Sequence, residues 1–175
     1  MRILAISGSL RAKSSNTAVL NAAKALASEE VNIKLYSGLE NLPHFNPDLD
    51  GDTLPNLVLS LRQQIAASDG ILISSPEYAH GVPGSLKNAL DWLVGSIEFP
   101  GKPVALINTN PRATIAQASL KEILHTMSAQ IIEPASVTLN IAGRGLNAEG
   151  IVRDRELSTN IKQAIAIFAR SIIPG

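Results

Sequence analysis

The sequence predicts an α/β fold in three layers, with a five-stranded parallel sheet in the order 2-1-3-4-5 and helices on both faces. Three observations lead to this prediction. Strand-like and helix-like segments alternate about five times, which is typical of right-handed strand–helix–strand crossovers. The strand over residues 2–6 is apolar from Ile3 on, and residues 71–73 and 104–107 are apolar throughout, as expected for strands that are buried on both faces. Residues 31–35 instead alternate apolar and polar side chains, which indicates an edge strand.

The expected helices lie between these strands. The first begins near Ser15 or Asn16, both residues that favour helix N-caps, and runs to about Ser28. Apolar residues at helical spacing predict the others over residues 54–68, 83–93, 115–127 and 157–172. Val137 and Leu139 predict a last short strand.

Composition sets bounds on the function. The 175 residues fit one domain, 1–175, and we expect neither a signal peptide nor a membrane span. The chain has no cysteine, which excludes disulfides and thiolate metal sites and fits a cytoplasmic location. Its 15 basic and 15 acidic residues cancel, which argues against nucleic-acid binding. The three histidines show no metal-ligand spacing, so no metal site is predicted.

Three loops follow the carboxyl ends of the expected central strands. They are Ser7 to Thr17, Ser74 to Gly84 and Asn108 to Thr114. In sheets of this strand order, ligands bind outside the carboxyl ends of the strands, where the strand order reverses. The three loops are therefore the expected binding site.

The first loop, "ISGSLRAKSSNTAVL" from Ile6 to Leu20, suits a phosphate. A helix N-terminus presents unpaired N–H groups, and the Arg11 guanidinium matches phosphate oxygens. Hydroxyl donors come from Ser9, Ser14, Ser15 and Thr17. The pattern is neither G-x-G-x-x-G nor a P-loop, so an anchored phosphate that stays intact fits better than phosphoryl transfer. A capped helix with a solvated arginine is the alternative.

The second loop, "SSPEYAHGVPGSLKNALDW" from Ser74 to Trp92, holds two glycines and two prolines. These residues make it rigid and expose backbone amides to a planar ligand, beside which Tyr78 and His80 can lie. The alternative is a plain turn that Pro76 and Gly81 fix, with Tyr78 packed on the fold.

Together, "GSLRAKSSNTAVL" and "PEYAHGVPGSLKNALDW" resemble the NADPH-dependent FMN reductase family of flavodoxin-like proteins, over nearly the whole chain. The resemblance implies a non-covalently bound FMN. Its phosphate would be held by Ser9, Arg11, Ser14 or Ser15, Asn16 and Thr17. Its ring would lie along Pro76, Glu77, Tyr78, Ala79, His80 and Gly81.

Two departures from the family pattern are informative. Many members have asparagine where this chain has Ala79. The third loop, often rich in serine and glycine in the family, reads "NTNPRAT" and brings Asn108 and Arg112 toward the pocket. Arg112 is expected to contact either the flavin edge or the 2′-phosphate of NADPH; a solvated helix residue is the alternative.

The resemblance implies an oxidoreductase in which NADPH or NADH reduces FMN, and reduced FMN passes electrons to a small-molecule acceptor. Free flavin, a quinone, an azo compound or chromate are the candidate acceptors. No catalytic side chain is predicted, because the cofactor carries the chemistry. The first alternative is a flavodoxin-like electron carrier without NAD(P)H turnover, and the second is an interaction protein that has lost its flavin.

The family resemblance also implies a homodimer or homotetramer. The segment "NLPHFNPDLDGD", from Asn41 to Asp52, is long for a link between a strand and a helix. We expect it to cover a neighbouring subunit or the mouth of the flavin site, and a self-packed surface loop is the alternative.

Overall fold

The computed structural model describes residues 1–51 and 53–172. The strands are β1 (Arg2–Ser7), β2 (Asn32–Leu35), β3 (Gly70–Ser74), β4 (Pro103–Asn108), β5 (Gln130–Ile131) and β6 (Val137–Thr138). The helices are α1 (Ser15–Leu26), α2 (Asn56–Ala66), α3 (Gly84–Val94), α4 (Thr114–Thr126), α5 (Ala148–Arg153) and α6 (Arg155–Ile172). Short 3₁₀ turns are η1 (Leu39–Asn41), η2 (Pro47–Leu49) and η3 (Glu133–Ala135).

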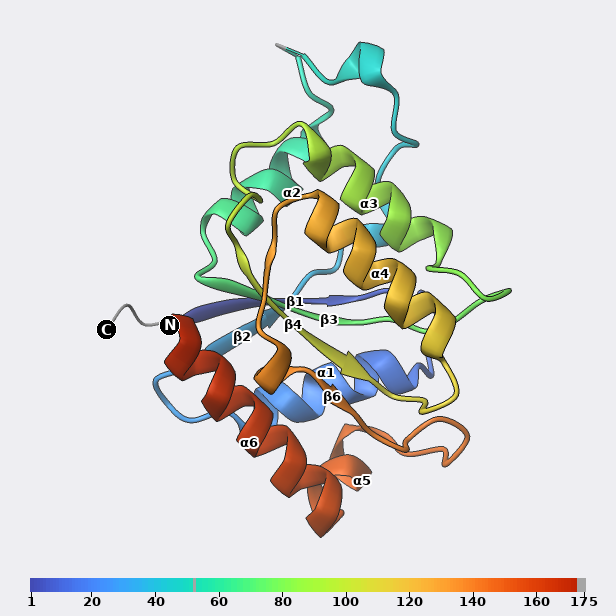
Figure 1. Cartoon of the computed structure of the whole chain (residues 1–175), viewed down its shortest axis with the longest axis vertical. Helices are drawn as coiled ribbons and strands as arrows, with labels where there is room; N and C mark the ends of the chain where they lie inside the picture. Colours follow the sequence, from blue (N-terminus) through green and yellow to red (C-terminus); the bar gives the residue numbers. More distant parts are fainter. Residues whose placement is uncertain (52, 173–175) are drawn as a thin grey trace.

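The sheet is parallel and has the order β2-β1-β3-β4-β5, which confirms the predicted order. β2 lies at the edge and alternates buried and exposed residues, whereas every residue of β3 is buried. The carboxyl ends of β1, β3 and β4 therefore meet on one side of the molecule (Figure 1).

The predicted last strand at Val137 and Leu139 is β6, and a second short strand, β5, precedes it and was not predicted. β5 pairs with the first half of β4, where Val104 lies opposite Ile131, and β6 pairs with its end, where Ile107 lies opposite Val137. The turn η3 separates the two strands and contains Pro134. Because proline has no backbone N–H, it cannot continue the ladder, so the strand position is split.

Helices cover both faces of the sheet (Figure 1), and an apolar core lies between the sheet and each helix layer. Leu4 and Ile6 of β1 point to the face that α2, α3 and α4 cover. Ile3 and Ala5 point to the opposite face, against α1, α5 and α6. This alternation follows from the two-residue period of a strand. It explains why the central strands are apolar throughout.

Helix α5 was not expected from the sequence. It is one and a half turns long and begins after Asn147, whose side chain accepts a hydrogen bond from the N–H of Gly150 at 2.9 Å. Ile151 is its only buried residue, so the apolar spacing is too short to show a helical period. The closing helix, predicted from Leu157, begins at Arg155.

The excursion before α2 packs on its own subunit. The carbonyl of Pro43 accepts hydrogen bonds from Asn88 Nδ2 at 2.9 Å and Trp92 Nε1 at 2.8 Å. The ring of Phe45 meets that of Trp92 edge to face, with centroids 5.0 Å apart. In Figure 1 the excursion projects beyond α3, away from the carboxyl ends of the strands. The excursion thus packs on α3 of its own chain, as in the self-packed alternative, and its contact with a neighbouring subunit stays a prediction. Asp52 lies outside the described residues.

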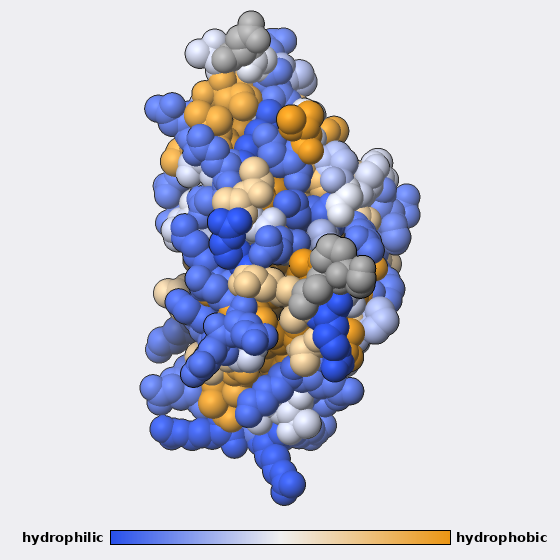
Figure 2. All heavy atoms as spheres, turned by 90° about the vertical axis from the view of Figure 1, so that its left-hand side faces the viewer, coloured by the Kyte–Doolittle hydropathy of each residue, from blue (hydrophilic) through white to orange (hydrophobic). Residues whose placement is uncertain are grey.

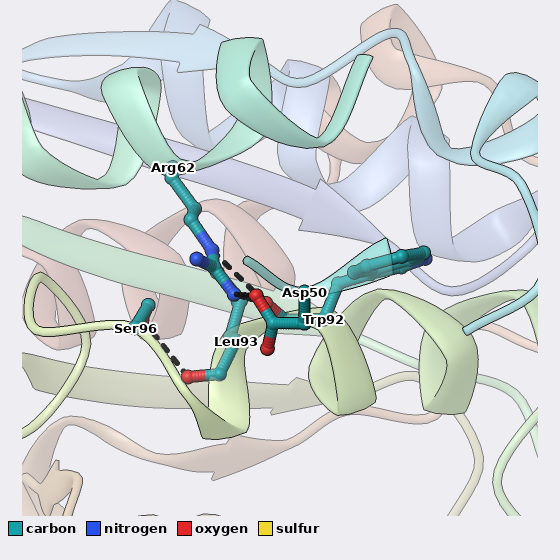
Figure 3. A network of polar contacts seen from close by, with 5 residues as sticks. All are labelled: Asp50, Arg62, Trp92, Leu93 and Ser96. Atoms are coloured by element: carbon teal, nitrogen blue, oxygen red, sulfur yellow. Dashed lines mark hydrogen bonds and ion pairs between the residues drawn. The ribbon is translucent and has the colours of Figure 1, made fainter. Parts of the chain in front are cut away.

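A buried guanidinium ties this excursion to α2 and α3 (Figure 3). Arg62 is 9% exposed, and its Nε and Nη2 donate to the carbonyl of Trp92 at 3.1 and 2.7 Å. Nη2 also bonds Asp50 Oδ1 at 2.8 Å. Trp92 lies in the last turn of α3, where carbonyls lack partners within the helix. The cation therefore stabilises a helix end and the excursion together.

The part of the chain that the structure describes holds no helix long and apolar enough to cross a membrane. Figure 2 shows apolar side chains in separate groups between polar ones on the side that it faces. Two apolar residues near the end of α3 are strongly exposed, Val94 at 62% and Ile97 at 91%.

We expect Arg62→Ala to lower the free energy of unfolding by about 3 kcal/mol, because it leaves the Trp92 carbonyl and the Asp50 carboxylate without their partner. Arg155→Ala, an exposed arginine at the start of α6, is the control and should change stability by less than about 0.5 kcal/mol. Urea denaturation of both variants measures this. Equal losses would show that the buried network contributes nothing specific.

Candidate functional site

The first two loops touch directly at the end of the sheet. The N–H of Gly8 donates to the carbonyl of Ser74 at 2.8 Å. A Cβ at Gly8 would lie 2.8 Å from Ser75 Oγ and 3.0 Å from a Leu86 methyl group. Only glycine permits so close an approach without a shift of the second loop.

Asn16 joins all three loops. It is 5% exposed, and its Oδ1 accepts from the hydroxyls of Ser74 at 2.9 Å and Thr109 at 3.3 Å. The Ser74 Oγ also lies 2.7 Å from the carbonyl of Ile107, and its single hydrogen can serve one of these acceptors at a time. The predicted phosphate ligand Asn16 thus turns its side-chain carbonyl into the interior.

The N-terminus of α1 keeps open donors. The N-cap is Ser14, one residue before the range predicted, and its oxygen accepts from the N–H of Thr17 at 3.2 Å. The Thr17 hydroxyl pairs with Ser7 Oγ at 2.9 Å. The N–H groups of Ser15 and Asn16 have no hydrogen-bond partner among the described residues. These donors and the partial positive charge of the helix end suit an anion.

A tight turn forms the tip of the second loop. Tyr78 and Gly81 exchange both backbone hydrogen bonds, at 3.1 and 2.9 Å. Between them Ala79 and His80 have φ of 49° and 58°, so both are left-handed, as in a type I′ turn. Asparagine and glycine favour this conformation, whereas alanine is strained in it. The N–H groups of Ala79 and His80 have no partner among the residues that the structure describes.

Glu77 holds this loop against α4. Its Oε2 accepts from the N–H of Ala116 in the first turn of α4 at 2.8 Å, and its Oε1 lies 3.0 Å from His80 Nδ1. The Ala116 N–H, and then His80, hold the pKa of the Glu77 carboxyl below its ordinary value of 4.5. Glu77 is therefore ionised at neutral pH and positions the turn. It is not suited to donate a proton.

The third loop separates its two predicted residues. Asn108 is buried at the end of β4, and its Oδ1 accepts from the N–H of Asn110 at 3.1 Å. Arg112 is exposed, and its own N–H donates to Asn110 Oδ1 at 3.1 Å. These successive side-chain turns direct the chain around the end of the sheet. Arg112 thus lies outside the loop interior and is exposed to solvent.

The loops enclose a cavity of about 280 Å³, which we call the first cavity. Its predicted lining residues are Ser9, Arg11, Ser14, Ser15, Asn16, Pro76, Glu77, Tyr78 and Asn108. The predicted residues that do not line it are Thr17, Ala79, His80, Gly81 and Arg112. The lining residues that sequence reasoning missed are Lys13, Ser75, Thr109, Asn110, Ala113, Ala142 and Gly143.

Most of the lining residues that were not predicted lie in the three loops that the sequence assigns to the site. Lys13 and Thr109 lie in loops already assigned to the site, where they could have been named by position alone. Ala142 and Gly143 come from the segment after β6, whose path depends on the split of the last strand. No signal in the sequence placed that segment at the cavity.

The donor chemistry of the first cavity fits a phosphorylated planar ligand such as FMN. The unpaired N–H groups of Ser15 and Asn16 and the Arg11 guanidinium lie on the side of the cavity that α1 and the first loop form. Tyr78 of the second loop lies on another side. Within the described ranges, no group of three or more His, Asp or Glu side chains is arranged for a metal ion.

Comparison with known proteins identifies the family. The family model described as "NADPH-dependent FMN reductase" matches residues 1–143. The chain belongs to this family. An NAD(P)H-dependent FMN reductase of Pseudomonas aeruginosa is 32% identical over 180 residues, which cover 98% of this chain and 97% of that one. An NADPH:quinone oxidoreductase of Arabidopsis thaliana is 35% identical, with 94% and 88% covered.

Solved structures agree. The flavoenzyme FerB of Paracoccus denitrificans, an NAD(P)H:(acceptor) oxidoreductase, aligns with a TM-score of 0.85 and 31% identity over 98% of this chain and 96% of that one. An archaeal flavodoxin with a TM-score of 0.65 and 14% identity shares the fold alone. The predicted family, fold, oxidoreductase class, FMN and NAD(P)H are thus confirmed.

We expect Ala79→Gly to raise the free energy of unfolding by about 0.5–1 kcal/mol, because glycine removes the left-handed strain while adding some freedom to the unfolded chain. Ala79→Asn should act in the same direction. Ala67→Gly is the control, since Ala67 has a right-handed φ of −74° and should lose stability. Chemical denaturation that shows losses at both positions would contradict strain in the turn.

Proposed function

We propose that FMN occupies the first cavity, with its phosphate at the N-terminus of α1 and its ring against Pro76, Glu77 and Tyr78. The ring would extend past the cavity wall toward the turn of Ala79, His80 and Gly81. The observation that carries this proposal is the set of open donors at the α1 end: the N–H groups of Ser15 and Asn16 and the exposed Arg11 guanidinium. Thr17 supports the phosphate site through Ser7 rather than from the cavity wall.

When bound, FMN supplies the hydride and electron chemistry of the reaction. The residues of the chain bind and orient it. Glu77 fixes the second loop to α4, so that the unpaired N–H groups of Ala79 and His80 are held in one orientation beside the ring. No protein nucleophile or acid–base pair is required.

We propose a quinone as the electron acceptor. Several relatives are named for this substrate, including a 2-hydroxy-1,4-benzoquinone reductase of a Burkholderia species that is 37% identical over 70% of this chain. The open mouth beside Tyr78, which is 49% exposed, gives a planar acceptor access to the ring.

A steady-state assay tests this assignment. Purified protein with FMN is supplied with NADPH or NADH and with a benzoquinone, free FMN, an azo dye or chromate. We expect the highest kcat/KM with the quinone. Flavin binding without NAD(P)H oxidation would favour the electron carrier instead, and no flavin binding would contradict the proposed cavity.

The family resemblance also supports a homodimer or homotetramer, and the exposed side chains of Val94 and Ile97 are consistent with a subunit contact.

A cytoplasmic location remains a prediction that the absence of cysteine supports.

Arg11→Ala should weaken FMN binding by about 10- to 150-fold, because a charge-assisted hydrogen bond to phosphate contributes about 1.5–3 kcal/mol. Turnover at saturating FMN should change less. Arg2→Ala, at the opposite end of β1, is the control. Flavin fluorescence titration gives both dissociation constants, and an unchanged constant in Arg11→Ala would refute the phosphate assignment.

Arg112→Ala should raise the KM for NADPH by about tenfold through loss of a charged hydrogen bond to the 2′-phosphate of about 1.5 kcal/mol. Arg112 is exposed and stands in the chain between the lining residues Asn110 and Ala113 without lining the first cavity itself, which suits this role better than contact with the flavin edge. NADH lacks this phosphate and is the internal control, so its KM should stay constant. An equal shift for both nucleotides would leave Arg112 as a solvated residue.

A further inference from the structure

A second cavity, of about 610 Å³, adjoins the first. The two share Lys13, Ser14 and Ser15, which surround the N-terminus of α1. The other lining residues are Ala12, Thr17, Ala18, Asn21, Gly145, Leu146, Asn147 and Ala148. The second cavity therefore begins where the first one ends, at the proposed phosphate position.

The walls of the second cavity come from two elements. One wall is the exposed side of the first turns of α1, and the other is the segment 145–148 that leads into α5. Figure 1 shows this segment beside the N-terminal half of α1. Small apolar side chains such as Ala18 and Ala148 leave the walls open to a flat group.

Two amides in the second cavity offer opposite hydrogen-bonding groups. Asn21 Nδ2 donates to the carbonyl of Thr17 at 3.1 Å, which leaves its Oδ1 as an acceptor. Asn147 Oδ1 accepts from Gly150, which leaves its Nδ2 as a donor. Adenine presents both an amino donor and ring-nitrogen acceptors, so a cavity lined by a free acceptor and a free donor suits its hydrogen-bonding groups.

The shared boundary between the cavities is positively charged. Lys13 is exposed and forms no ion pair with any described residue. No lining residue of the second cavity is acidic. A ligand that continues past the first phosphate would therefore meet a cation at the position of a second phosphate.

We propose that the second cavity is an adenylate subsite, which takes the AMP half of FAD while the flavin and its first phosphate occupy the first cavity. This inference rests on the proposed FMN site. The same AMP half occurs in NAD(P)H. The second cavity meets the first one at Ser14 and Ser15, which is the proposed position of the flavin phosphate. Tyr78, beside the proposed ring, lines only the first cavity. An AMP group that is joined to the flavin through its phosphate, as in FAD, therefore fits the second cavity better than the AMP half of NAD(P)H.

The test compares the dissociation constants of FMN and FAD in four proteins. In the unchanged protein, we expect FAD to bind within about tenfold of FMN. Ala148→Trp fills the second cavity and should weaken FAD at least about tenfold and FMN less than about twofold. Lys13→Ala should weaken FAD about tenfold more than FMN. Ala66→Trp, at an exposed position of α2 outside both cavities, should change neither constant.

Other outcomes overturn the proposal in different ways. If FMN binds and FAD does not, the adenylate subsite is wrong and the proposed function stands; if neither flavin binds, the proposed function fails. If Ala148→Trp raises the KM for NADPH and NADH on the FMN-loaded protein without changing FAD binding, the cavity serves the nicotinamide dinucleotide instead. If Ala148→Trp does not fold, equal effects of Lys13→Ala on both flavins decide against the proposal.

Discussion

The site depends on one buried oxygen, Oδ1 of Asn16. It lies within hydrogen-bond distance of the Ser74 hydroxyl at the end of β3, at 2.9 Å, and of the Thr109 hydroxyl in the loop after β4, at 3.3 Å. A buried amide oxygen without such partners would cost free energy, so the three elements are held at a fixed mutual distance. The same residue offers its backbone N–H at the start of α1. Ordering the interior therefore also aims the helix end at the first cavity.

In the second loop, neighbouring contacts stabilise both a strained turn and a charged side chain. The left-handed Ala79 and His80 persist because the Tyr78–Gly81 bonds close the turn, and Glu77 fixes it to α4. Such strain is a feature of binding sites that the surrounding structure must stabilise. The ionised Glu77 carboxylate accepts a hydrogen bond from the N–H of Ala116, and its other oxygen lies beside His80 Nδ1. It therefore opposes an anionic ligand less than its position on the cavity wall suggests.

The sequence predicts the fold well because the signals that decide it are strong. Continuous apolar strands and one alternating strand are consequences of burial on two faces or one, and they gave the order of the sheet. The split of the last strand and helix α5 were missed, because two-residue strands and a single buried Ile151 leave too short a pattern. Nine of the predicted site residues line the first cavity. Of the others, Thr17 pairs with Ser7, the residues Ala79, His80 and Gly81 form the turn after Tyr78, and Arg112 is exposed.

The missed residues show how the site extends beyond what local motifs can reveal. Ala142 and Gly143 reach the first cavity, and 145–148 reach the second, only because β6 runs alongside the end of β4 and carries the chain back to α1. The net charge of the chain, which is zero, does not indicate an anion site either. Arg11 and Lys13 nevertheless concentrate positive charge at one helix end, where the helix dipole adds to it. A chain that is neutral as a whole can therefore still concentrate positive charge at one helix end, where the charge suits an anion.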